Sequence, residues 1–196
     1  MNPRTATVER KTAETDIRLT LNLDGEGSYR NETGIPFFDH MLDLLAKHSL
    51  IDIDLTAVGD LDVDYHLTGE DVGLALGEAL NCALGDRKGI TRYGWSLVPM
   101  DEALSRVAVD LGGRPYLVYD IANQDRMIRD FDVWLLKHFF ESLVQQARMN
   151  LHIAQLDADD VHHAYESVFK GCARALRIAV ARDPREKGVP SSKGVL

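Results

Sequence analysis

Apolar and polar residues alternate along two matched segments of the chain. The first reads "RLTLNLDG" at residues 18–25, the second reads "RVAVDLGG" at residues 106–113, and both end in a glycine turn. Alternation places successive side chains on opposite faces of an extended chain, which is typical of a strand with one buried face. Residues 51–60 and 151–160 are a second strand-like pair, in which the alternation is clearer in the first copy. The pattern predicts two matched sets of half-buried strands.

The segments beside these strands have helical periodicity and are matched in the same way. Residues 39–48 ("DHMLDLLAKH") and 137–146 ("KHFFESLVQQ") are amphipathic, and each opens on a histidine. Residues 66–80 ("HLTGEDVGLALGEAL") and 162–176 ("HHAYESVFKGCARAL") follow the later strand of each set. The order strand, helix, strand, helix therefore occurs twice, with a further extended stretch before the first helix of each half. Self-similarity of this kind indicates internal duplication.

The repeat predicts an α+β fold made of two similar halves. Each half should be a mostly antiparallel, four-stranded sheet with helices packed on one face, a two-layer α/β sandwich. Packing the helical layers together would give one domain over residues 1–196, with repeats at approximately 1–90 and 91–185. Residues 186–196 would then form a C-terminal tail. Its Gly, Pro, Ser and charged residues predict a mobile end unless a ligand or a neighbouring subunit orders it.

Charge and composition narrow the classes of function. The net charge is -9 and the pI is about 5.2, whereas nucleic acid and anionic membrane surfaces both require a basic face. We therefore expect neither as a partner. No apolar run approaches the roughly 18 residues of a membrane span, and "MNPRTATVER" lacks the apolar core of a signal peptide. These features predict a soluble, cytoplasmic protein in which Cys82 and Cys172 are reduced and buried.

Histidine and glutamate recur at helical spacing. In "HHAYE", Glu166 follows His162 by four residues and His163 by three, and both spacings place the glutamate beside a histidine on one helix face. The two histidines point about 100° apart on a helix, so they could serve two different metal ions. His66 and Glu70 repeat the four-residue spacing in the first half.

Two further histidines complete a possible metal-ligand set. His40 and His138 lie at matched positions near the start of the two amphipathic segments. The full set comprises His40, His66, Glu70, His138, His162, His163 and Glu166. Imidazole and carboxylate ligands without thiolates suit Mn, Fe, Co or Zn, and not a thiolate-rich structural zinc site. One such histidine alone is more often a cap or surface residue, but duplication of both helices favours metal binding. His48 and His152 have no matched partner, and we expect them to be structural.

Landmarks along essentially the full chain resemble those of the imidazoleglycerol-phosphate dehydratase family of histidine biosynthesis. They include "ETDI", "LNLDGEG", "FFDHMLD", "TGEDVGLALGEAL", "GDRKGITRYG", "PMDEAL", "HFFESL", "HHAYESVFKGCARAL" and "PSSKGVL". The resemblance implies a duplicated α+β fold, a homo-oligomeric shell of 24 subunits and a dinuclear Mn²⁺ site between subunits. It also implies a lyase that dehydrates D-erythro-imidazoleglycerol phosphate, a small phosphorylated imidazole substrate, to imidazole acetol phosphate and water.

The resemblance further implies roles for individual residues. The metals would act as Lewis acids that stabilise the imidazolate and so ease loss of the hydroxyl. Glu14 of "ETDI" would contact substrate and move protons, Asp101 of "PMDEAL" would help organise the site, and the ligands His66 and Glu166 would take part in catalysis. The implied phosphate contacts are Arg92, Arg114, Lys170, Ser191 and Lys193. Through the last two, the tail would bind substrate.

One expected metal ligand is missing. The family motif is usually Asp-His-His-Thr-x-Glu-Asp with its second histidine on a metal, and this chain has Leu67 at that position. Leucine cannot coordinate a metal, and loss of even a residue that supports a ligand costs roughly 10–100-fold in metal affinity. Leu44 stands where the family usually has Gln, Ala158 and Asp160 replace Gly and Asn, and Lys137 replaces a common Glu.

Three interpretations remain open at this stage. The chain could be a working dehydratase with seven protein ligands, or a diverged enzyme that uses one firmly held metal on a related phosphorylated substrate. It could also be a non-catalytic homologue that keeps the fold, the oligomer and the phosphate pocket but has an impaired dinuclear site. The intact phosphate residues favour the first two interpretations, because a purely structural role does not require them.

Overall fold

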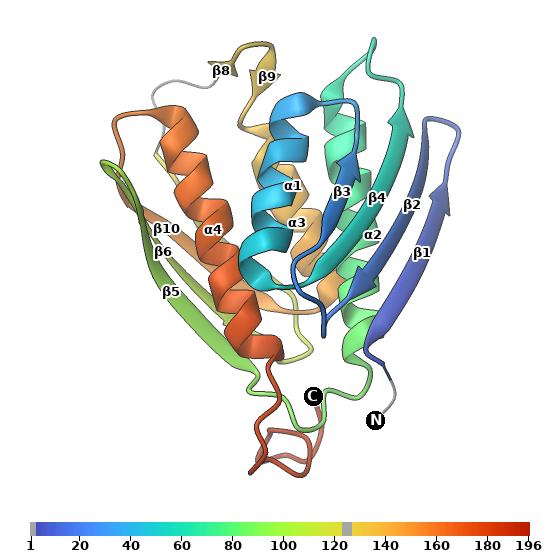
Figure 1. Ribbon diagram of the computed structural model, residues 1–196, viewed down its shortest axis with the longest axis vertical. Helices are drawn as coiled ribbons and strands as arrows, with labels where there is room; N and C mark the ends of the chain where they lie inside the picture. Colours follow the sequence, from blue (N-terminus) through green and yellow to red (C-terminus); the bar gives the residue numbers. More distant parts are fainter. Residues whose placement is uncertain (1–2, 123–126) are drawn as a thin grey trace.

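The computed structural model describes residues 3–122 and 127–196, in which four helices lie between two four-stranded sheets (Figure 1). The first half contains β1 (Thr5–Lys11), β2 (Thr15–Asn22), β3 (Tyr29–Glu32), α1 (Pro36–Ser49), β4 (Asp52–Gly59) and α2 (Tyr65–Leu84). The second half contains β5 (Tyr93–Met100), β6 (Ala103–Asp110), β7 (Tyr116–Asp120), the short strands β8 (Met127–Ile128) and β9 (Phe131–Asp132), α3 (Leu135–Ala147), β10 (Asn150–Asp157) and α4 (Val161–Val180).

The two sheets have the same topology. Their strand orders are β1-β2-β4-β3 and β5-β6-β10-β7, and in each sheet only the last pair is parallel. The parallel strands β3 and β4 are joined through α1, as a parallel pair requires a crossover. The prediction of mostly antiparallel sheets with helices on one face is confirmed. The predicted strands 18–25 and 106–113 each run three residues too far, because β2 and β6 end at Asn22 and Asp110.

Glycines let the helical layers of the two halves approach closely. A Cβ added to Gly73 of α2 would lie 2.5 Å from the carbonyl oxygen of Phe139 in α3, and one added to Gly77 would lie 2.5 Å from that of Leu143. Either contact is far below van der Waals distance, so a larger residue would separate α2 from α3. The core between the layers includes fully buried phenylalanines from three of the helices, Phe38, Phe139, Phe140 and Phe169.

The C-terminal tail makes hydrogen bonds to the segment before β5. The backbone N–H of Gly89 donates to the carbonyl of Gly188 (2.9 Å), and the Arg92 guanidinium donates to the carbonyl of Pro190 (2.7 Å). The tail therefore folds back against the start of β5, and its mobility without a ligand or a neighbouring subunit stays a prediction. The prediction for the cysteines is half wrong, because Cys172 is buried whereas Cys82 is exposed. No helix in the described residues has the length and apolarity to cross a membrane.

Candidate metal centre and phosphate pocket

The histidine-bearing helices α2 and α4 start at the same end of the molecule, beside β8 and β9 (Figure 1). Asp160 caps α4: its carboxylate accepts hydrogen bonds from the backbone N–H groups of His162 (2.7 Å) and His163 (3.0 Å). Asp64 caps α2 by accepting from the N–H of His66 (3.0 Å). Aspartate is a favoured N-cap, so the caps fix where both His/Glu segments begin.

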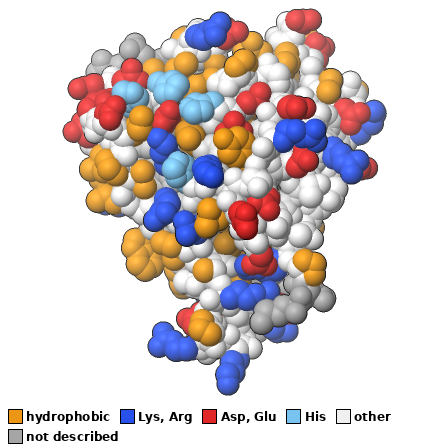
Figure 2. Space-filling view, in the orientation of Figure 1, with side chains coloured by type: hydrophobic (Ala, Val, Ile, Leu, Met, Phe, Trp, Pro, Cys, Tyr) orange, Lys and Arg blue, Asp and Glu red, His pale blue; other side chains and the backbone are white. Residues whose placement is uncertain are grey.

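Three side chains from α1 and α4 converge at this end, and we call them the α1–α4 cluster: His40, His162 and Glu166. One carboxylate oxygen of Glu166 lies 3.0 Å from His40 Nε2 and 3.1 Å from His162 Nε2, and the three ligand atoms lie within 4.8 Å of one another. Histidine side chains gather at this corner of the surface (Figure 2). Two imidazole nitrogens and a carboxylate oxygen are a donor set suited to Mn, Fe, Co or Zn.

The carboxylate of the α1–α4 cluster is strongly acidic. Burial of Glu166, which is 8% exposed, acts to raise its pKa, but hydrogen bonds from Lys170 (2.5 Å) and the two histidines lower it to about 2. The side chain is therefore ionised at neutral pH. An ionised carboxylate accepts hydrogen bonds and binds metal, so Lys170 keeps the cluster in its ligating form.

This ionisation predicts a pH dependence of stability for the metal-free protein. The pKa of Glu166 is about 2 when folded and 4.5 in its ordinary state, so the unfolded state binds the extra proton as pH falls. The stabilisation, at most about 3 kcal/mol, is present above pH ~4.5 and is lost as pH falls towards ~2. Urea unfolding of wild type and Glu166→Gln between pH 6 and 3.5 measures it: the wild-type advantage should shrink with acidification, and a constant difference would contradict the assignment.

A second group of side chains lies between α2 and α3, and we call it the α2–α3 cluster: His66, Glu70 and His138. The rings of His66 and His138 have centroids 4.4 Å apart, and His66 Nε2 lies 3.3 Å from a Glu70 carboxylate oxygen. His138 also faces Glu141 at 3.3 Å. Leu67 is half-buried next to His66 in α2. Among the described residues, only the α1–α4 cluster brings three ligand atoms within 4.8 Å.

Each cluster combines both halves of the repeat. His40 comes from the first half and meets His162 and Glu166 of the second, whereas His138 comes from the second half and meets His66 of the first. The cross-pairing follows from the packing of α1 on α4 and of α2 on α3. The seven predicted ligands thus divide into two groups of three, with His163 left over.

His163 points to the turn between β5 and β6. Its Nδ1 lies 2.9 Å from a Glu102 carboxylate oxygen, and its Nε2 lies 3.9 Å from Asp101. The hydrogen bond with His163 lowers the pKa of Glu102 to about 2. Asp101, predicted to help organise the site, is therefore beside a predicted metal ligand.

Four of the five predicted phosphate residues line one pocket of about 350 Å³: Arg92, Arg114, Ser191 and Lys193. Arg92 is held in place by Asp110, which accepts from Nε (2.7 Å) and Nη2 (3.1 Å). The pocket lies between the end of β6 and the C-terminal tail. Lys170, the fifth predicted residue, is instead bound to Glu166 in the α1–α4 cluster.

Glu14 is not brought to either cluster within one chain. It is exposed at the turn between β1 and β2, where its backbone N–H bonds to the Thr12 hydroxyl (3.1 Å). No hydrogen bond or ion pair among the described residues links its side chain to a histidine. Its predicted role therefore requires a partner surface or a bound substrate.

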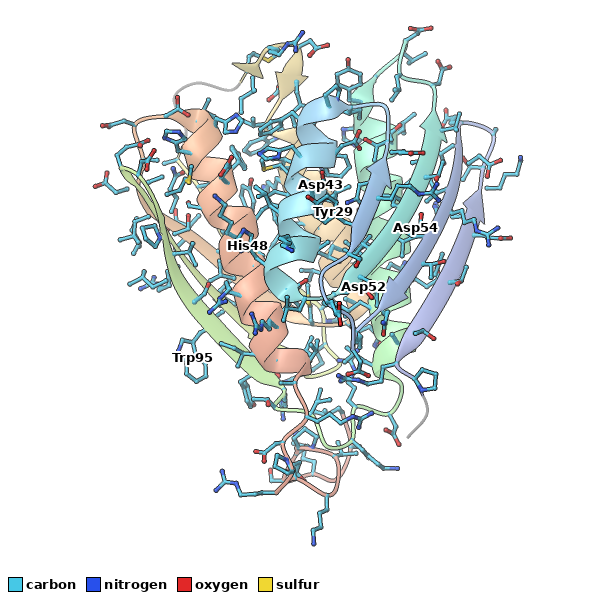
Figure 3. All side chains as sticks on the ribbon, viewed as in Figure 1. Tyr29, Asp43, His48, Asp52, Asp54 and Trp95 are labelled. Atoms are coloured by element: carbon cyan, nitrogen blue, oxygen red, sulfur yellow. The ribbon has the colours of Figure 1, made fainter. Side chains whose placement is uncertain are left out.

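One neighbour of the clusters, Glu102, was missed from the sequence. Glu102 adjoins Asp101 in "PMDEAL" and could have been noticed there. His48, expected to be structural, is on the last turn of α1 and lies beside α4 (Figure 3). Burial, together with the nearby charges of Lys170 and Arg174, lowers the pKa of His48. The nearness of His48 to these charged residues of α4 follows from the packing of α1 on α4, which periodicity alone does not reveal.

The fold and these clusters define a duplicated α+β protein with side chains able to hold a metal ion. The model of the imidazoleglycerol-phosphate dehydratase family matches residues 33–176. The dehydratase of Acidithiobacillus ferrooxidans is 53% identical over 100% of this chain and 99% of its own length. That of Neisseria gonorrhoeae is 53% identical over 98% of this chain, which spans only 64% of that relative. The crystal structure of the Staphylococcus aureus dehydratase superimposes with a TM-score of 0.83 at 33% identity, covering 91% of this chain and 99% of that one.

The chain belongs to the imidazoleglycerol-phosphate dehydratase family. The resemblance of the sequence motifs is thereby confirmed.

Proposed function

We propose that the chain dehydrates D-erythro-imidazoleglycerol phosphate to imidazole acetol phosphate and water in histidine biosynthesis, as a carbon–oxygen hydro-lyase. The observation that carries the proposal is the α1–α4 cluster, a compact metal-ligand set, in a chain of this family that also has a cationic pocket. The cluster suits an imidazole substrate, because metals that bind histidine also bind the substrate's ring.

The donor set fits the Mn²⁺ that the family resemblance implies. His40, His162 and Glu166 would hold one ion, and His66, Glu70 and His138 would hold another more weakly, with His163 as a further ligand. We propose Mn²⁺, with Fe, Co or Zn as alternatives for the same donors. When bound, these ions supply Lewis acidity at the imidazole nitrogens.

The chain's own groups bind substrate and move protons. Arg92, Arg114, Ser191 and Lys193 would bind the phosphate through charge-assisted hydrogen bonds. Glu14 would take the proton from carbon and deliver it to the leaving hydroxyl, and Asp101, next to His163, would help organise the site. Lys170 maintains the ionised state of Glu166 from within the cluster, and it could also reach a phosphate from there.

One chain alone does not complete the site. The backbone N–H of Arg92 bonds to Ala179 (2.9 Å), which lies 13 positions after Glu166 in α4, or about 20 Å along the helix axis. A three-carbon phosphate arm is too short to span that distance. We therefore propose that the phosphate pocket of one copy faces the metal cluster of another, in a homo-oligomer that the family resemblance makes a 24-mer.

An exposed apolar strip on β5 offers a contact surface for such an assembly. Tyr93, Trp95 and Leu97 alternate along the strand and are 50%, 67% and 61% exposed, and Trp95 points away from the helices (Figure 3). Gly94 faces α4 on the inner side of the sheet, where an added Cβ would lie 1.9 Å from the carbonyl oxygen of Ala175. Because side chains alternate along a strand, the three apolar residues face outward. A contiguous exposed apolar strip marks an interaction surface. We propose neither a nucleic-acid nor a membrane partner.

Arg114→Ala is expected to weaken substrate binding. A hydrogen bond between charged groups contributes about 1.5–3 kcal/mol, so KM should rise about 10- to 100-fold with metal content unchanged. Steady-state kinetics measures the change, with the exposed Arg18→Ala as a matched loss of charge away from the pocket. Equal KM values for wild type and Arg114→Ala would remove Arg114 from the phosphate site.

Mixing two defective variants tests whether sites are shared between copies. Glu166→Ala damages the metal cluster and Arg114→Ala damages the phosphate pocket, so each assembly alone should be impaired. In particles co-assembled at random from equal amounts, roughly a quarter of shared sites would be intact. Recovery of activity on co-assembly supports the shared site, whereas no recovery beyond the sum of the separate variants contradicts it.

The turnover assay tests the function itself. Manganese-loaded protein should release imidazole acetol phosphate from imidazoleglycerol phosphate, and removal of metal with a chelator should stop the reaction. Absence of product from the loaded protein would favour the second candidate function, a diverged or non-catalytic homologue. Leu67 is the observation that favours this second candidate, because the family motif has a metal-binding histidine at this position and leucine cannot coordinate a metal.

A further inference from the structure

Glu102 lies in the two-residue turn that joins β5 to β6. The turn is tight, and Asp101 adopts a left-handed backbone conformation with φ 48°. A non-glycine residue held in this conformation costs free energy and persists only where its surroundings fix it. The pairing of Met100 with Ala103 across the turn fixes the backbone here, so the side chain of Glu102 is held at a defined position next to the start of α4.

The two carboxylate oxygens of Glu102 have different partners. One accepts a hydrogen bond from the backbone N–H of Asp160 (2.9 Å), the N-cap residue of α4. The other lies 2.9 Å from Nδ1 of His163. A single side chain therefore fixes both the start of the ligand-bearing helix and the ring of one histidine on it.

The pairing decides which histidine nitrogen is free. An ionised carboxylate can only accept hydrogen bonds, so Nδ1 of His163 must carry the hydrogen. In the neutral ring the lone pair is then on Nε2. This nitrogen lies on the side of Asp101, 3.9 Å from its carboxylate. The ring is thus oriented with its ligating nitrogen towards a second carboxylate.

We propose that Glu102 is a positioning residue, which fixes the tautomer and orientation of His163 so that Nε2 binds the metal ion. The proposal rests on the metal-dependent function proposed above and adds a residue to it. Carboxylates that hold the non-ligating nitrogen of a metal-bound histidine typically support metal affinity by roughly 10–100-fold.

The first half of the repeat lacks this device. The β1–β2 turn is anchored to α2 through Thr15, whose hydroxyl donates to Asp71 (2.5 Å), and the position that matches His163 is Leu67. The Glu102–His163 pair is therefore specific to the second half. Because Leu67 supplies no equivalent ligand, the orientation of His163 carries more of the metal binding than it would in a symmetric site.

Calorimetric titration of metal-free protein with Mn²⁺ tests the proposal through affinity rather than activity. Glu102→Ala should bind roughly 10–100-fold more weakly than wild type, and Glu102→Gln should recover part of the loss because its amide oxygen can still accept from Nδ1. The thermal midpoint of the metal-free variants and the control Glu78→Ala, an exposed glutamate on α2, report any general effect on folding. If Glu102→Ala does not fold, Glu102→Gln still provides the comparison with wild type.

His163→Ala and His40→Ala separate the possible failures. If His163→Ala weakens binding but the Glu102 variants bind as wild type does, Glu102 positions nothing and the proposal is overturned. If only His40→Ala weakens binding, His163 is not a ligand, and the proposal fails while the metal function stands. If none of these variants changes binding, the proposed metal site itself is wrong.

Discussion

Glu166→Gln is expected to cause the largest loss of function of any single substitution in this chain. Glu166 contacts both histidines of the α1–α4 cluster and also Lys170, so the amide removes a metal ligand and leaves a largely buried cation without its charge partner. Metal affinity should fall by at least about 100-fold, and turnover should fall with it. The free energy of unfolding should drop by about 1–3 kcal/mol because Lys170 loses its partner.

Metal content and turnover of the same sample measure this effect. Glu78→Gln makes the same chemical change at an exposed position on α2 and serves as the matched control. A Glu166→Gln protein that retains its metal and its turnover would show that the α1–α4 cluster is not the metal centre.

Leu67→His is expected to strengthen metal binding, because it restores the imidazole that the family motif has at this position. The added imidazole would lie next to His66 in the first turn of α2, at the position that His163 occupies in α4. Restoring a ligand should raise the affinity of the weaker site by roughly 10–100-fold, and turnover at limiting manganese should rise. Because Leu67 is half-buried, an imidazole of similar size can take its place with little repacking.

Leu67→Gln is the control for this gain, since it introduces polarity without an imidazole. Titration with Mn²⁺ should show tighter binding of the second equivalent in Leu67→His and no gain in Leu67→Gln. Identical binding curves for wild type and Leu67→His would mean that this position does not face a metal ion in this chain.

The sequence predicted the parts of the fold that periodicity determines. Alternation over 51–60 and helical spacing over 162–176 have strong signals, since each element buries one face against the core. Duplication strengthened these signals, because the same order of elements appeared twice. The chain also contained recognisable family motifs, which indicated the histidines and the phosphate residues together.

The arrangement of the site could not be predicted to the same degree. Lys170 pairs with Glu166 instead of joining the phosphate pocket, and Glu14 lies apart from both clusters. Helical spacing places residues on one face of their own helix but does not indicate which face of another element they meet. The role of Glu102 depends on a turn that approaches α4 from a different part of the chain, a tertiary contact with no local signal.

The most direct test of the account is turnover measured against metal content in the wild-type protein. Metal-free chain would be titrated with Mn²⁺, with bound metal per chain and dehydration of imidazoleglycerol phosphate measured on the same samples. The account predicts no turnover without metal and a rise in turnover as the α1–α4 cluster fills. Full metal loading with an intact phosphate pocket and no turnover would contradict it, as would turnover that is independent of metal.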